Sequence, residues 1–503
     1  MFDKQTLGLN DLKFSIMEGF FAVILLSASI SFIIPYAIYL GATSLEIGFL
    51  TAFPALFAAW AQLFSIRILD VIKSRKKMVI IFCFLQILLF IPIMFIQFIL
   101  NENQIFWVIL FYTFSLVTGA LAGPIWQSWM KSIVPNKIMG SFLGFRNSIV
   151  GVSTFAFLLI FGFSLKLFEA QIGIVFFGIF LSGVFGRFIG TLLFFKISEP
   201  KEKINFEKKI RFIGFVKNLK KNKFGYFILY GSLMSFGIAL TGPFVGYHYL
   251  ENLGLKNDYF IYTILISTAM IASIIGMTYW GKIINQFGSI KTLKATSRLV
   301  IFFPILYVII RNPLPLLLVQ FFDGLLFSGF NLALATFVYD YSSSKKIIRF
   351  GTYQAIFFGT AIFFGAIISG FLQTFQVNFF FISNSFYLIC LISVIVRFIV
   401  FKKYFKKVTE VKQVDYIKTN KLVYSILTFE PVMKMIPKIV LFDDENKKIK
   451  ITIKKRIEYM NKIIDNQSNH LTNVLINNKI KTKIREKTNN LKIKRLNKKN
   501  IKK

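Results

Sequence analysis

The chain has 503 residues, of which 55% are hydrophobic and 17% aromatic, and its formal net charge is +37. One water-soluble core could not bury so much apolar surface, so this composition excludes a soluble globular protein. Apolar runs of about 20 residues, the length that crosses a bilayer as a helix, recur from residue 14 to residue 401. The sequence therefore predicts an all-α integral membrane protein.

Polar breaks divide the apolar residues into twelve predicted transmembrane helices. The first six are expected at residues 14–40, 45–66, 78–100, 105–127, 146–168 and 172–195. The second six are expected at residues 224–250, 259–281, 295–311, 314–340, 351–372 and 378–401. We therefore expect a six-helix bundle over 1–195, a loop over 196–223, a second six-helix bundle over 224–401 and a tail over 402–503.

The distribution of Lys and Arg predicts the orientation, because these residues concentrate in cytoplasmic loops. With the N-terminus inside, the inner segments before the tail carry 27 Lys and Arg residues, ten of them in the 196–223 loop. The outer loops carry three, which are Lys166, Lys256 and Arg311. We therefore expect a multi-pass protein of the cell membrane with both termini and the 196–223 loop in the cytoplasm.

The two groups of six spans show a weak internal repeat when the sequence is shifted by about 208 to 215 residues. The segment Pro35–Tyr39 matches Pro243–Tyr247, and Gly151 matches Gly359. Arg187 matches Arg397, each followed by Phe and Ile. Six helices separate the members of each pair, so both copies would have the same orientation and be related by an axis along the membrane normal.

Two loops at equivalent places carry related motifs. The loop after the second span, RILDVIKSRKK at residues 67–77, holds the acid Asp70 and the basic residues Arg75 and Lys76. The loop after the eighth span, GKIINQFGSIKTLK at residues 281–294, holds Gly281, Gly288 and Lys291 and has Asn285 at the position of the acid. A carboxylate in such a loop can accept hydrogen bonds at a helix N-terminus and meet basic partners.

Both loops resemble the signature loop of the major facilitator superfamily, in which a glycine, an acid, a second glycine and a basic pair follow one another. Ile66 and Lys73 stand at the glycine positions of the first copy. The resemblance implies a twelve-helix fold of two six-helix repeats and a gating role for Asp70. Arg146, after the fourth span, would then exchange partners between access states, with Asp70 or Glu199 as candidates. The alternative is that Asp70 only caps a helix and the lysines only orient the chain.

Asp323 is the most informative polar residue within a span, since it lies nine residues into the predicted tenth helix, roughly 13 Å deep. A carboxyl group there could exchange a proton or pair with a cationic solute, or it could be purely structural. Helices 1, 4, 7 and 10 line the central cavity in the superfamily. The resemblance therefore extends the candidate solute or proton site to Gln320 and Asn331 on the tenth helix and to Tyr112 and Ser115 on the fourth.

Three more charged residues stand near the cytoplasmic ends of spans. We expect Glu18 to reach water, and we expect Arg187 and Arg397 to extend their side chains toward the membrane surface in structural roles. The tail, 402–503, holds 28 of the 60 basic residues against 9 of the 23 acidic ones. Such a tail could bind anionic lipid or could be solvated, and no specific nucleic-acid module accompanies it.

We expect a secondary transporter that moves a small solute by alternating access, with protons as one candidate coupling ion. The alternative is a non-transporting sensor or scaffold of the same fold that acts through its tail. An enzyme, a cofactor and a metal site are not expected. Residues 276–282, GMTYWGK, imitate a phosphate-binding loop, but Ile283 stands where Ser or Thr must reach magnesium.

Overall fold

The structure is a computed structural model that describes residues 3–134, 139–200, 212–341, 347–375 and 384–410. The chain divides into two compact units, Met1–Tyr424 and Ser425–Lys503, and the described residues all belong to the first. Most of the basic tail, 402–503, which could bind anionic lipid or be solvated, lies outside the described residues. Its role therefore stays a prediction.

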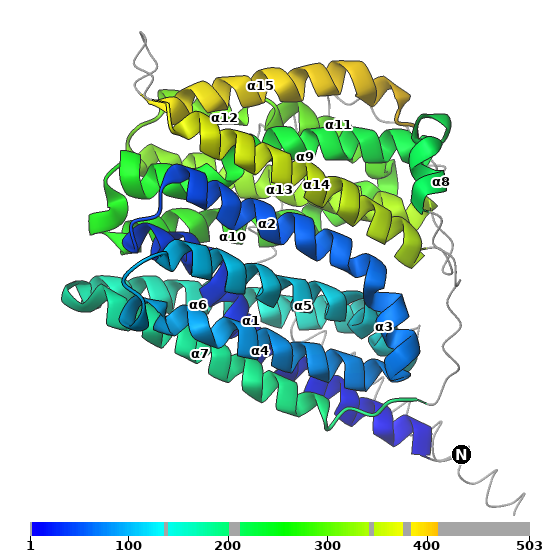
Figure 1. The fold of residues 1–503 in the computed structure, drawn as a ribbon. Coiled ribbons are helices and arrows are strands. Elements are labelled where there is room, and N and C mark those ends of the chain that lie inside the picture. Colours follow the sequence, from blue (N-terminus) through cyan, green and yellow to red (C-terminus); the bar gives the residue numbers. More distant parts are fainter. Residues whose placement is uncertain (1–2, 135–138, 201–211, 342–346, 376–383, 411–503) are drawn as a thin grey trace, which may run out of the picture. The chain divides into compact units, whose positions relative to one another are not determined.

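Every secondary-structure element among the described residues is a helix (Figure 1). The helices before the predicted central loop are α1 (Asp3–Tyr39), α2 (Ser44–Ala61), α3 (Ser65–Ile72), α4 (Arg75–Ile99), α5 (Gln104–Ile133), α6 (Met139–Leu167) and α7 (Ile172–Phe194). Those that follow are α8 (Phe212–Lys217), α9 (Lys223–Tyr247), α10 (Tyr259–Phe287), α11 (Ser289–Val300), α12 (Phe303–Ile309), α13 (Pro313–Tyr341), α14 (Ile347–Gln373) and α15 (Ser385–Tyr404).

Twelve segments of the described chain are long and apolar enough to cross a membrane, which confirms the predicted number of spans. The ninth differs from the prediction because it begins at Ser289 and consists of two helices, α11 and α12. Pro304 lies in the first turn of α12, where its missing N–H and fixed φ favour a new helix start. The eighth span, α10, also continues to Phe287, six residues beyond its predicted end at 281.

Local sequence signals explain where several helices begin. Thr43 and Glu46 form a capping box at the start of α2: the Thr43 hydroxyl accepts from the Glu46 N–H, and a Glu46 carboxylate oxygen accepts from the Thr43 N–H at 2.8 Å. Asp258 caps α10 by accepting from the N–H groups of Phe260 and Ile261. These contacts give hydrogen-bond acceptors to backbone N–H groups at the helix starts, which the hydrocarbon chains of lipid cannot do.

Helices α1 and α7 pack closely because glycines line their contact. Gly183, Gly186 and Gly190 recur every three or four residues on one face of α7. A Cβ at Gly186 would lie 2.8 Å from the Phe21 carbonyl oxygen of α1, so only glycine permits this approach. Small residues serve this purpose in membranes, where packing rather than water exclusion drives helix association.

Two further helix pairs join the first seven helices to those that follow. Helix α2 lies beside α14 (Figure 1), where a Cβ at Gly48 would be 2.9 Å from the Ala366 carbonyl oxygen. Along the same pair, the Trp60 indole N–H donates to the Thr360 hydroxyl at 3.1 Å. Helix α6 lies beside α10. The α2–α14 and α6–α10 contacts therefore link the two predicted bundles.

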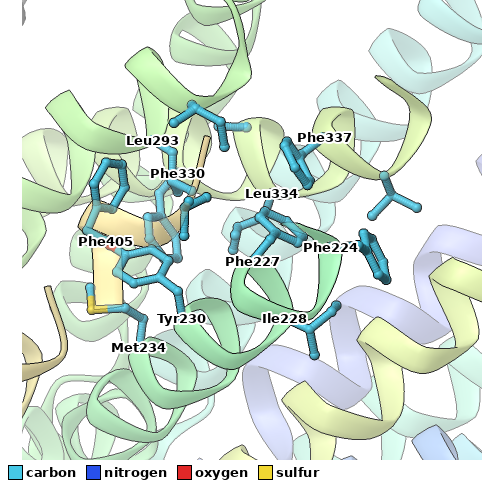
Figure 2. Packing of buried hydrophobic residues seen from close by; sticks show 14 of the residues in the cluster. Phe224, Phe227, Ile228, Tyr230, Met234, Leu293, Phe330, Leu334, Phe337 and Phe405 are labelled. Atoms are coloured by element: carbon cyan, nitrogen blue, oxygen red, sulfur yellow. The ribbon is translucent and has the colours of Figure 1, made fainter. Parts of the chain in front are cut away.

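Aromatic side chains fill the interior between α9, α11, α13 and the end of α15. Figure 2 shows part of this cluster, in which Phe227 stacks on Phe337 with ring centroids 4.1 Å apart. The Tyr230 ring meets Phe405 edge-on at 5.0 Å, and its hydroxyl donates to Ser297 at 2.7 Å. These contacts pack α9 against α11, α13 and the residues that follow α15.

Candidate functional site

A cavity of about 550 Å³ lies among helices α1, α2, α5, α9, α13 and α14. Its walls are mostly aliphatic and aromatic, with Phe327 and Phe330 on α13 among them. The polar side chains that line it are Thr51, Tyr112, Ser235 and Asn331. Because helices from both sides of the predicted central loop contribute, the cavity lies between the two predicted bundles.

The cavity brings together two of the five predicted site residues. Tyr112 on α5 and Asn331 on α13 both line it. Gln320 does not, since its buried amide donates to the hydroxyl of Tyr249 within the helices after the central loop. Ser115 also faces away, and its hydroxyl donates to the Gln86 carbonyl of α4 at 3.2 Å. Whether these residues bind solute stays a prediction.

Asp323, the fifth predicted site residue, lies on α13 outside the cavity lining. Its carboxylate interacts electrostatically with the guanidinium group of Arg397 on α15. The two groups form no ion pair within 4.0 Å, and Asp323 has no hydrogen-bond partner among the described residues. Arg397 donates to the Val300 carbonyl and to the Thr241 hydroxyl, both at 2.8 Å.

A charged cluster lies inside the first group of helices. Glu18 on α1 pairs with Arg146 on α6 at 2.8 Å and with Arg187 on α7 at 3.2 Å. Arg187 also donates to the Gln86 side chain at 3.0 Å and to the Cys83 sulfur at 2.9 Å. One carboxylate thus joins three helices and is shared between two cations.

Two predictions about charged residues near helix ends are wrong, one in this cluster and one in the helices after the central loop. Glu18 does not reach water, because only 3% of its surface is exposed. Arg397, which is 2% exposed, does not extend to the membrane surface either. Arg146 meets Glu18 rather than Asp70 or Glu199, and its guanidinium lies 4.4 Å from the centre of the Trp126 ring. The helices bury Glu18, Arg146 and Arg187 together because their opposite charges offset the cost of desolvation.

The two predicted gating loops share one backbone feature. Lys73, between α3 and α4, has φ 58°, and Gly288, between α10 and α11, has φ 87°. Both stand at the position of the second glycine in the signature loop. A left-handed residue there ends one helix and allows the next to start at once, so glycine is the favoured residue and Lys73 adopts a less favourable conformation.

The N-terminus of α4, after the first loop, is capped by the Glu199 carboxylate, a role that was not predicted from the sequence. Glu199, which follows α7, accepts from the Ser74 hydroxyl and the Arg75 N–H, both at 2.6 Å, and from the Lys76 N–H at 3.2 Å. The Lys76 ammonium donates to the carbonyls of Phe195 and Ile197. These contacts bind the start of α4 to the end of α7.

Asp70 has no such contact. It is exposed on α3 and makes no ion pair or hydrogen bond with another described residue, so its gating role stays a prediction. In the second loop, Gly281 and the exposed Asn285 lie within α10. There the N–H of Ile290, beside Lys291, donates to Glu410 at 2.8 Å.

The comparisons with known proteins agree with this architecture. The family model of the Major Facilitator Superfamily matches residues 17–335. The chain belongs to this superfamily. It is therefore a multi-pass membrane transporter rather than an enzyme. No curated protein matches the sequence significantly.

Solved structures of superfamily transporters share the fold at low identity. The nucleoside transporter NupG is 14% identical, with a TM-score of 0.59 over 79% of this chain and 98% of its own. A D-xylose-proton symporter is 11% identical, with a TM-score of 0.60 over 81% and 99%. A bacterial homologue of the iron transporter ferroportin, in its inward-facing state, is 11% identical, with a TM-score of 0.57 over 79% and 99%.

Some features of this superfamily member were not predicted from its sequence as parts of the site. Ser235, a polar residue of the seventh span, lines the cavity although it is not one of the five predicted site residues; its place on a span that lines the cavity in the superfamily was the available signal. Pro54 and Pro243 also line the cavity. A proline inside an apolar span was the available signal, since it interrupts helix hydrogen bonding.

Proposed function

We propose that the protein moves a small solute across the cell membrane by alternating access of two six-helix halves, residues 1–195 and 224–401. The observation that carries this proposal is the central cavity, whose walls come from α1, α2 and α5 of one half and α9, α13 and α14 of the other. A site between two halves opens to one side of the membrane and then to the other when the halves rock against each other.

Matching contacts support the division into repeated halves. Helix α1 lies beside α7 as α9 lies beside α15, and α4 lies beside α5 as α11 lies beside α13. Glu199 caps α4 after the sixth span, and Glu410 binds the first turn of α11 after the twelfth. Together with the shared positive φ of Lys73 and Gly288, these pairs have offsets of 211 to 215 residues, close to those of the sequence repeat.

Contacts between the halves at the end remote from α3 support a closed outer side. Lys166 at the end of α6 forms a 3.1 Å ion pair with Asp258, the N-cap of α10. Nearby, the Phe163 and Phe260 rings meet edge-on, with centroids 5.9 Å apart. Exposed ion pairs are weak, so these contacts could break when the outer side opens.

We infer that both termini and Lys73 face the cytoplasm while Lys256 is external, because of the loop charges. Single cysteines at these exposed lysines test the orientation, and the native Cys83 and Cys390 are buried. In intact cells, an impermeant thiol reagent should label cysteine at 256 and should label cysteine at 73 only after the cells are opened. Labelling at 73 from outside would reverse the orientation.

The transport proposal is tested by filling the cavity. Gly242 lines it, and a Cβ there would meet no atom within 4 Å. Gly242→Leu should therefore fold normally and abolish solute uptake into proteoliposomes. Gly178→Leu is the matched control, since Gly178 on α7 also faces open space but does not line the cavity.

The uptake measurement uses a panel of labelled small solutes and compares the purified wild type with both variants. We expect uptake of at least one solute by the wild type and by Gly178→Leu, and none by Gly242→Leu. Equal uptake by both variants would exclude this cavity as the route. No uptake by the wild type from any panel would contradict transport and favour a sensor or scaffold.

A further inference from the structure

We propose that the cavity selects an uncharged solute that has an apolar body and several hydrogen-bonding groups. This inference rests on the proposed function and names its substrate class. It follows from three properties of the cavity wall: the described lining holds no ionic group, three of its polar side chains have no partner among the described residues, and two of its helices contain a proline.

The first property concerns charge. Among the described residues that line the cavity there is no Asp, Glu, Lys, Arg or His. The charged groups within the bundle lie elsewhere and act on each other: Glu18 pairs with Arg146 and Arg187, and Asp323 interacts with Arg397. An ionised solute would lose its hydration on entering and find no counter-charge, which is strongly unfavourable.

The second property concerns hydrogen bonds. Tyr112 and Ser235 are 6% and 8% exposed, yet neither hydroxyl has a hydrogen-bond partner among the described residues. The Asn331 amide, which is exposed, is also unpaired there. Thr51 differs, because its hydroxyl donates to the Ile47 carbonyl of its own helix at 3.3 Å. Polar groups at the cavity wall that have no protein partner are available to hydrogen-bond with a solute or with water.

The third property adds backbone acceptors. Pro54 and Pro243 lie inside α2 and α9 and have no N–H to donate. The carbonyls four residues earlier belong to Leu50 and Ala239, and both residues line the cavity. Each carbonyl therefore lacks its normal partner within the helix. These residues of the cavity wall therefore add backbone acceptors without a normal helix donor, which favours a solute with hydroxyl or N–H groups.

Size agrees with this class. A volume of about 550 Å³ lies within the range of sites for small organic ligands, roughly 300 to 1,000 Å³. The aliphatic walls and the rings of Phe327 and Phe330 suit an apolar or cyclic body. The few polar groups would fix its orientation and reject close relatives that cannot hydrogen-bond.

Matched solute pairs that differ by one ionic group test the inference. Proteoliposomes would receive a neutral alkyl glycoside with its uronic acid counterpart, and indole-ethanol with tryptamine and indole-acetate. We expect uptake only of neutral members, at least tenfold above that of their ionised counterparts. Preferred uptake of an ionised member would overturn the inference while leaving transport intact. No uptake of any probe by the wild type would overturn both.

A charge placed in the wall gives a second test. Asn331→Asp should lower uptake of the neutral probes at least tenfold and give measurable uptake of tryptamine, because it adds the missing counter-charge. The control is Gln127→Glu, which makes the same change at an exposed α5 residue outside the lining and should behave as wild type. Unchanged selectivity in Asn331→Asp would overturn the inference.

Discussion

Replacing Glu18 by glutamine is expected to lower the free energy of unfolding by about 3 kcal/mol, because it leaves two buried cations without their shared carboxylate. Glu18 is nearly inaccessible and contacts Arg146 at 2.8 Å and Arg187 at 3.2 Å. Unfolding in mixed micelles measures the change. Labelling of Cys83, whose sulfur accepts from Arg187, reports whether the cluster itself has opened.

A double-mutant cycle separates the ion pair from general disruption. Glu18→Gln combined with Arg187→Gln should cost at least about 1 kcal/mol less than the sum of the two single changes, since contacting residues are not additive. Glu251→Gln is the control for losing an exposed carboxylate that pairs with Lys256, and it should cost below about 1 kcal/mol. If Glu18→Gln matches this control, the cluster does not hold the helices together.

Asp323→Asn is expected to abolish proton-driven accumulation of solute while solute counterflow survives. We propose Asp323 as the coupling carboxyl because it precedes Phe327 of the cavity lining by one turn of α13 without lining the cavity itself, and because Arg397 is its electrostatic partner. Proton binding would neutralise the carboxylate and weaken its interaction with Arg397. Asparagine mimics that protonated form, so exchange without net proton movement should continue.

Asp340→Asn is the matched control on the same helix, α13. Asp340 accepts from the Ser289 hydroxyl at 2.6 Å, so its replacement should affect stability but leave coupling intact. Accumulation and counterflow that fall together in Asp323→Asn would assign Asp323 to solute binding. A stable Asp323→Asn protein with normal, pH-dependent accumulation would remove Asp323 from the mechanism.

The twelve spans could be predicted from the sequence because each span must satisfy two local requirements, apolar length and internal backbone hydrogen bonds. Helix starts such as Thr43 and Asp258 also depend on residues within one turn. The ends of the ninth span were harder to predict from the sequence. The span begins with a partly polar segment at Ser289 and contains a proline, and both lower its average hydrophobicity. Its true start depends on how α11 packs against α13.

The pairing of charges was decided only by the tertiary structure. Glu18 meets Arg146 and Arg187 across separations of 128 and 169 residues, and Glu199 reaches Ser74 across 125. Composition shows that such residues exist but does not say which will meet. Glycine-lined contacts such as that of Gly186 bring α1 and α7 close enough for these charges to be buried together.

The sequence by itself determined the class of protein, the number of spans and the residues available in each. Which residues line the cavity depended on how each helix is rotated about its axis. A nearly uniform apolar span does not reveal this rotation, because its lipid-facing and buried positions have similar composition. Tyr112 and Asn331 therefore face the cavity, whereas Ser115, on the same helix as Tyr112, faces α4. Only packing against neighbouring helices chose between these outcomes.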